Sequence, residues 1–177
     1  MNDFACQDGQ RYQNEIKTPD GLKWATMGTV LYYEWEMACC GSFFELGDRV
    51  EWTVSKVLPK DMDWIDENPV YIRLKPYFVT DYKYESHTSW HEDFLILDGI
   101  VRKITIICIT RALSPKKPQF LEPVSGFTWN IKNSRYRDNA YIHSRLRANK
   151  YFNVDAYKVF LDDVHLRPCT LEDWERE

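Results

Sequence analysis

Glycine is scarce in this sequence, and long apolar runs are missing. Only 7 of the 177 residues are glycine, and no glycine-rich phosphate loop, dinucleotide-binding fingerprint or serine nucleophile elbow occurs. The first residues hold neither a basic nor an apolar region, so we expect no signal peptide. The longest strongly apolar stretch, residues 104–109, is far too short to cross a bilayer. We therefore expect no membrane partner, and the sequence offers no motif of a nucleotide-dependent enzyme.

The cysteine content does not fit a disulfide-bonded scaffold. Five cysteines are an odd number, and reduced thiols in the cytoplasm are the simplest interpretation. Hydrophobic residues make up 44% of the chain and charged residues 28%, which excludes a disordered chain. The length suits a single domain with its own core.

Charge is unevenly distributed behind a net charge of −4. Residues 1–70 carry 6 basic and 13 acidic side chains, whereas residues 111–150 carry 9 basic and 2 acidic ones. Such asymmetry arises when two faces of one fold complement each other, or when a basic surface meets an outside partner.

Alternation of apolar and polar residues predicts strands. It occurs at residues 50–54, 127–131 and 157–161, and residues 29–35 form a β-branched and aromatic run. Residues 70–74 are a further strand candidate. The Asp98-Gly99 pair lies between two apolar runs and predicts a two-residue hairpin turn. The continuous run 104–109 indicates a strand that is buried on both faces or bulged.

Helix signals are fewer. Asp138 is a candidate cap for one short helix, and Thr170 with Asp173 resembles a capping box for another. The sequence thus predicts a mainly β fold, namely a small antiparallel barrel or half-open barrel of SH3- or OB-like type with one or two short helices. An α+β sandwich is the alternative. We expect residues 1–27 to form an N-terminal arm and residues 28–177 a single β-rich domain.

The densest group of unusual residues lies between positions 35 and 52. It reads Trp35-x3-Cys39-Cys40-Gly41-x2-Phe44-x2-Gly47-Asp48-x-Val50-x-Trp52. This signature run resembles that of a family of small, uncharacterised bacterial proteins known only as a domain of unknown function. The resemblance implies a domain boundary near residue 28 and assigns no activity.

Cys39 and Cys40 are the first candidate site. Vicinal cysteines can be small buried hydrophobes, metal ligands or a redox pair. Burial is favoured, because free cysteine is among the most buried residue types. Adjacent cysteines also cannot easily occupy two corners of a tetrahedral zinc site. His87 and His91 would complete a Cys2His2 set, so zinc is the alternative to our expectation of no metal and no cofactor.

The second candidate site is the basic and aromatic segment 126–150. Cations that follow phosphates, with rings that stack on bases, are typical of a surface for single-stranded nucleic acid. The candidate contact residues are Trp129, Lys132, Arg135, Tyr136, Arg137, Tyr141, Arg145 and Arg147. The acidic flanks favour the other interpretation, charge pairing within the fold or with a protein partner.

The function that these observations predict is a non-catalytic binding module for a protein or single-stranded nucleic-acid partner. An aromatic content of 15% suits such a role, because aromatic side chains are enriched at interfaces. The alternative is a metal- or thiol-dependent enzyme or redox protein centred on Cys39, Cys40 and His91.

Overall fold

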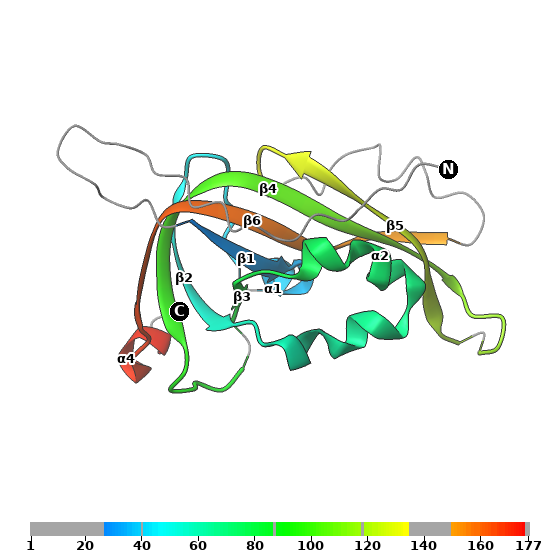
Figure 1. The fold of residues 1–177 in the computed structure, drawn as a ribbon, viewed down its shortest axis with the longest axis horizontal. Coiled ribbons are helices and arrows are strands. Elements are labelled where there is room, and N and C mark those ends of the chain that lie inside the picture. Colours follow the sequence, from blue (N-terminus) through cyan, green and yellow to red (C-terminus); the bar gives the residue numbers. More distant parts are fainter. Residues whose placement is uncertain (1–26, 40, 87, 118, 135–149, 176–177) are drawn as a thin grey trace, which may run out of the picture.

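The computed structural model describes residues 27–134 and 150–175, except residues 40, 87 and 118. Its elements, in chain order, are β1 (Gly28–Tyr33), α1 (Glu34–Cys39), β2 (Arg49–Lys56), η1 (Pro59–Glu67), α2 (Pro69–Phe78), β3 (Tyr82–Tyr84), β4 (Leu95–Leu113), β5 (Leu121–Ile131), β6 (Lys150–Pro168) and α4 (Leu171–Trp174) (Figure 1). The predicted mainly β fold is confirmed. The predicted arm and the helix expected after Asp138 lie outside the described residues.

The strands form one six-stranded mixed sheet. Their order is β2-β3-β1-β6-β4-β5, and β2 also pairs with β4. Hydrogen bonds therefore close a ring of five strands, and β5 lies outside this ring on β4. The β1–β3 pair is parallel and the other pairs are antiparallel.

Two hydrophobic cores lie on opposite faces of β4. Ile104, Ile106 and Cys108 belong to a core inside the ring. Ile107 and Ile109 belong to a second core under the helices. The pairing with β6 shifts by one residue between Ile107 and Cys108. The prediction that residues 104–109 are buried on both faces is confirmed, and the bulge is present as well.

The second core is covered by η1 and α2, which lie together below the sheet in Figure 1. The Asn68 side chain accepts a hydrogen bond of 2.8 Å from the backbone N–H of Val70, and Pro69 follows the cap. Val70, Leu74 and Phe78 repeat every four residues and are buried on one helix face. The strand predicted at residues 70–74 is therefore wrong, because the Asn-Pro start signal and this spacing specify a helix.

Gly99 lies within β4, so the hairpin predicted at Asp98-Gly99 is also wrong. Pairing with β6 jumps from Asp98 opposite His165 to Ile100 opposite Asp162. Asp163 takes a positive φ of 51° in the bulge between them. A Cβ on Gly99 would lie 3.3 Å from the carbonyl oxygen of Asp162. Glycine is therefore used here for close approach to the bulge rather than for a turn.

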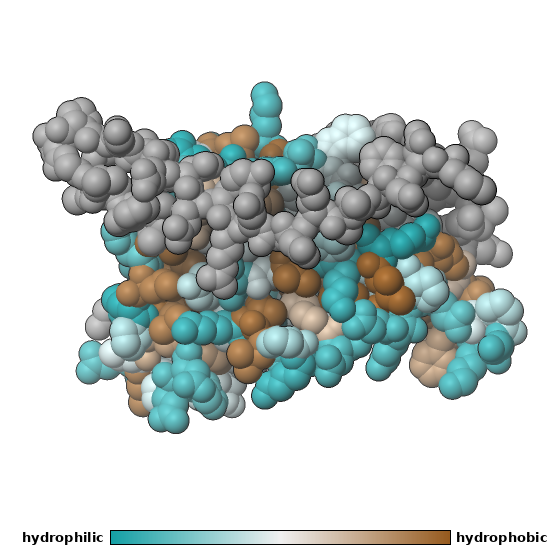
Figure 2. All heavy atoms as spheres, in the orientation of Figure 1, coloured by the Kyte–Doolittle hydropathy of each residue, from teal (hydrophilic) through white to brown (hydrophobic). Residues whose placement is uncertain are grey.

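An ion pair joins β4 to β6, and a hydrogen bond from its arginine reaches α2. The Arg111 guanidinium donates two hydrogen bonds of 2.7 and 2.6 Å to the Asp155 carboxylate, and a third of 3.1 Å to the Tyr71 hydroxyl. Both charged side chains are largely buried. The hydrogen bonds that Arg111 donates to Asp155 raise the pKa of Arg111. Where described residues are visible in Figure 2, hydrophobic and hydrophilic side chains are interspersed.

The short C-terminal helix α4 begins as the sequence predicts. The Thr170 hydroxyl accepts from the Asp173 N–H, and the Asp173 carboxylate accepts from the Thr170 N–H. The capping box is confirmed.

Candidate functional site

The signature run supplies part of the core inside the ring. Phe44 is 3% exposed, and its ring centroid lies 5.0 Å from Trp52 and 5.6 Å from Tyr32. A Cβ on Gly41 would overlap the Tyr32 hydroxyl. Gly47 has a φ of 94°, and its N–H donates to the carbonyl of Val101 on β4. Gly41, Phe44, Gly47 and Trp52 are therefore structural positions of the run, whereas Trp35 is 52% exposed.

The cysteines are not uniformly buried. Cys39, at the end of α1, is exposed, so the burial expected for it is wrong. Cys108 and Cys169 are buried free thiols, and burial raises the pKa of Cys108 to about 12. Cys40 lies outside the described residues.

The proposed Cys2His2 set is only half described. His91 is exposed and lies 3.5 Å from the Asp93 carboxylate, and its Nδ1 accepts from the Asp93 N–H. His87, like Cys40, lies outside the described residues. Within the described ranges, no group of three or more His, Cys, Asp or Glu side chains is arranged to hold a metal ion.

Two members of the predicted basic face are described. Trp129 on β5 is 55% exposed, and Lys132 follows the end of β5 as an exposed residue. Arg135, Tyr136, Arg137, Tyr141, Arg145 and Arg147 lie outside the described residues.

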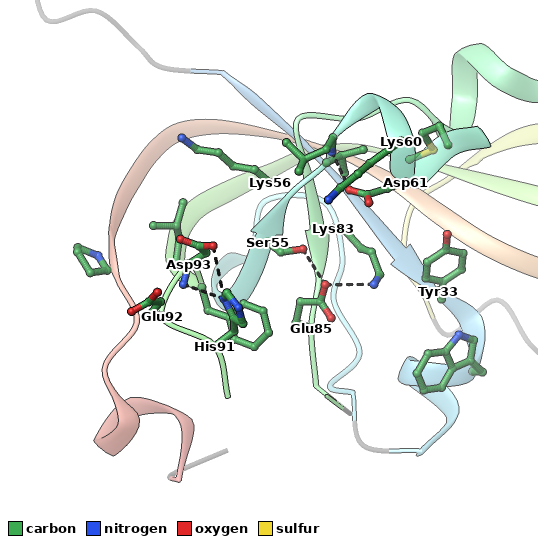
Figure 3. A pocket seen from close by; sticks show the side chains of 17 residues that line it. Tyr33, Ser55, Lys56, Lys60, Asp61, Lys83, Glu85, His91, Glu92 and Asp93 are labelled. Atoms are coloured by element: carbon green, nitrogen blue, oxygen red, sulfur yellow. Dashed lines mark hydrogen bonds and ion pairs between the residues drawn. The ribbon is translucent and has the colours of Figure 1, made fainter. Parts of the chain in front are cut away.

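The described residues form a groove of about 850 Å³ (Figure 3). Its walls come from β1 and α1, β2, η1, β3 and the segment that leads into β4. Trp35, Leu58 and Phe94 supply apolar surface. Of the residues singled out in the sequence, Trp35 and His91 line it, whereas Cys39 is not among the described lining residues.

A buried carboxylate lies in the wall of the groove. Glu85 is 5% exposed, just past the end of β3. Its Oε1 accepts a hydrogen bond of 2.6 Å from the Ser55 hydroxyl and one of 3.1 Å from the Lys83 ammonium. Its Oε2 is also buried and has no hydrogen-bond partner among the described residues. Figure 3 shows Glu85 between Ser55 and Lys83, with His91 on one side and Tyr33 on the other.

A second buried carboxylate, Glu36 on α1, lies close enough to Glu85 for the two charges to interact. It is 1% exposed and accepts a hydrogen bond of 3.3 Å from the backbone N–H of Tyr33. Burial raises the pKa of Glu36 to about 7, although Lys83 opposes the rise, and the charge of Glu85 adds to it. Burial, with the negative charges nearby, raises the pKa of Tyr33 to about 12. Glu36 and Glu85 are thus two buried carboxylates whose negative charges repel each other, and Lys83 opposes this repulsion.

Glu36→Gln should stabilise the protein at high pH. The pKa of Glu36 is raised in the folded state from 4.5 to about 7, so its contribution to stability is full below pH 4.5 and is lost as the pH rises through 7. Glutamine does not titrate. The free energy of unfolding of the variant, relative to the wild type, should increase by about 2–3 kcal/mol from pH 5 to pH 8, because over this range the wild type gains a charge on a buried carboxylate and the variant does not.

Urea denaturation at the two pH values measures this difference. Glu92→Gln removes the same charge from an exposed position in the groove and is the control. A pH-independent difference for Glu36→Gln would contradict the raised pKa.

Sequence reasoning did not identify Ser55, Lys83 or Glu85. These residues carry no motif, and they meet only because β2 and β3 pair, with Lys83 opposite Ser55. The one local signal is a carboxylate directly after Tyr84, a buried aromatic residue in a strand.

A model of a family of unknown function, DUF6578, matches residues 26–148. This match covers most of the chain and begins close to the boundary expected near residue 28. No curated protein and no solved structure matches the sequence. No described helix is long and apolar enough to cross a membrane.

Proposed function

The chain belongs to DUF6578, a family of unknown function, and we propose that it is a non-catalytic binding module whose groove receives a short segment of a partner protein. The observation that carries this proposal is the open groove itself, which joins apolar surface to a buried carboxylate whose Oε2 has no hydrogen-bond partner among the described residues. Buried polar groups of this kind are expected to find a partner.

The charges of the groove favour a protein partner over nucleic acid. Three lysines and four acidic residues line it, namely Lys56, Lys60, Lys83, Asp61, Glu85, Glu92 and Asp93. A surface that follows a phosphate backbone is predominantly basic. Mixed charges around an apolar centre are instead typical of protein–protein contacts.

A displayed library of random linear peptides tests the proposal. We expect enriched peptides to bind the wild-type chain, and Trp35→Ser combined with Leu58→Ser to weaken binding by about tenfold or more, because the apolar anchors are lost. Ile72→Ser combined with Leu171→Ser is the matched control, since both residues are similarly exposed apolar side chains outside the groove.

Other outcomes would favour the alternatives. Failure to enrich any peptide, or equal binding by the two double variants, would reject the groove as a peptide site. Salt-dependent binding of single-stranded RNA that is weakened by Lys132→Glu would favour the basic face. Stoichiometric zinc in protein purified without a histidine tag would favour the enzyme centred on Cys39, Cys40 and His91.

Two further parts of the proposal concern the fold and the location. The ring of five strands is a small half-open barrel. The inner core supports this description, because all five ring strands contribute side chains to it.

The protein acts in the bacterial cytoplasm. The free thiols of Cys39, Cys108 and Cys169 support the cytoplasmic location.

A further inference from the structure

Resting on the groove function proposed above, we infer that Glu85 receives a cationic side chain, arginine or lysine, from the partner segment. This assigns the groove a chemical preference that neither its shape nor the family match gives. The inference depends on the hydrogen bonding of Glu85, on the charges around it and on the rings beside it.

The hydrogen bonding of Glu85 is incomplete. Ser55 and Lys83 both donate to Oε1, whereas Oε2 has no partner among the described residues. The side chain is only 6% exposed, so water does not replace the missing donor at low cost. A ligand that brings an N–H group to Oε2 would remove this penalty.

The charges near Glu85 favour a cationic donor over a neutral one. Glu36 and Glu85 are both buried, and Lys83 is the positive charge that opposes them. Glu92 and Asp93 add exposed negative charge at the wall beside His91 (Figure 3). A guanidinium or ammonium group would therefore gain a charge-assisted hydrogen bond in a water-poor place.

The aromatic side chains of the groove also favour binding of a cationic side chain. Tyr33 is half-buried and Trp35 is 52% exposed, and both line the groove that contains Glu85. Cations bind favourably over the faces of such rings. Arginine has the better shape, because its planar fork stacks on a ring while it donates to a carboxylate.

N-acetylarginine amide, titrated against the full chain by NMR, tests the inference without a known partner. We expect saturable shifts of the amide signals of Ser55, Lys83 and Glu85 at millimolar probe. N-acetylcitrulline amide has almost the same shape without the charge and should bind at least about tenfold more weakly. Equal binding of the two probes, or no binding of the arginine probe, would overturn the inference.

Two variants locate the contact. Glu85→Gln keeps an oxygen for Ser55 and Lys83 and should weaken the arginine probe by about tenfold. Glu67→Gln, which removes the same charge from an exposed position outside the groove, should change its affinity by less than about twofold. An equal loss of affinity in the two variants would reject Glu85 as the contact. Should Glu85→Gln fail to fold, the comparison of the two probes on wild-type protein still decides.

Proton release gives an independent readout. A cation beside Glu85 lowers the pKa of Glu36, which is about 7 in the free protein. Calorimetry at pH 7 in two buffers of different ionisation enthalpy should therefore show proton release with the arginine probe and none with Glu36→Gln. Enriched peptides that bind the groove without arginine or lysine would leave the binding module intact and reject only the cationic preference.

Discussion

Replacing Gly41 with alanine is expected to lower the free energy of unfolding by about 3 kcal/mol or more. The new Cβ would overlap the hydroxyl of Tyr32, which is fully buried, and would lie 2.8 Å from the Cα of Met37. Neither can move cheaply, because one belongs to the core inside the ring and the other to the backbone of α1. The loss is therefore at the upper end for an overpacked site.

Gly47→Ala is the control for this experiment. Gly47 has a φ of 94° and nothing within 4 Å of an added Cβ, so its replacement adds backbone strain alone, about 1–2 kcal/mol. Urea denaturation of the two variants separates steric overlap from strain. Equal losses would contradict the packing of Tyr32 against Gly41.

Replacing Phe44 with alanine should cost about 4 kcal/mol. Phe44 lies in a loop, yet it is 3% exposed and contacts three aromatic rings, those of Tyr32, Trp52 and Tyr157, at 5.6, 5.0 and 6.2 Å. Truncation to alanine would leave a cavity between rings that the surrounding strands hold in place. Both the transfer energy and the ring contacts are then lost.

Phe44→Leu fills most of that space and should cost about 1.5 kcal/mol or less. Thermal or urea unfolding of both variants gives the comparison. A loss below about 1 kcal/mol for the alanine variant would show that Phe44 is not part of a packed core.

These two experiments bear on how the signature run is interpreted. Gly41, Phe44 and Trp52 have packing roles, and Gly47 supplies a positive φ. Trp35 and Cys39 are exposed. A motif of this kind identifies a fold more readily than it identifies a chemistry.

The sequence predicted strands correctly where apolar and polar residues alternate. Residues 50–54, 127–131 and 157–161 all lie in strands. Burial follows the alternation at Tyr157, Val159 and Leu161, whereas Trp129 is 55% exposed. A strand was wrongly predicted at residues 70–74 because Val70 and Ile72 are β-branched. The tertiary contacts of α2 outweigh that preference. The hairpin turn was wrongly predicted at Gly99 because glycine occurs both in turns and beside bulges.

The groove could not be predicted in this way. Its carboxylate, Glu85, is buried by elements far apart along the chain, and its partner Ser55 lies 30 residues away. Charged residues are almost never fully buried without a partner, so a sequence gives no reason to single one out. Burial of this kind becomes visible only when the pairing of β2 with β3 is known.

The two 19-residue strands β4 and β6 make unfolding of the protein cooperative. Each lends residues both to the ring and to the layer under the helices. Unfolding of β4 or β6 would therefore expose both cores, and we expect the two cores to unfold together. Cleavage of the chain within either strand should disrupt both the core inside the ring and the core under the helices.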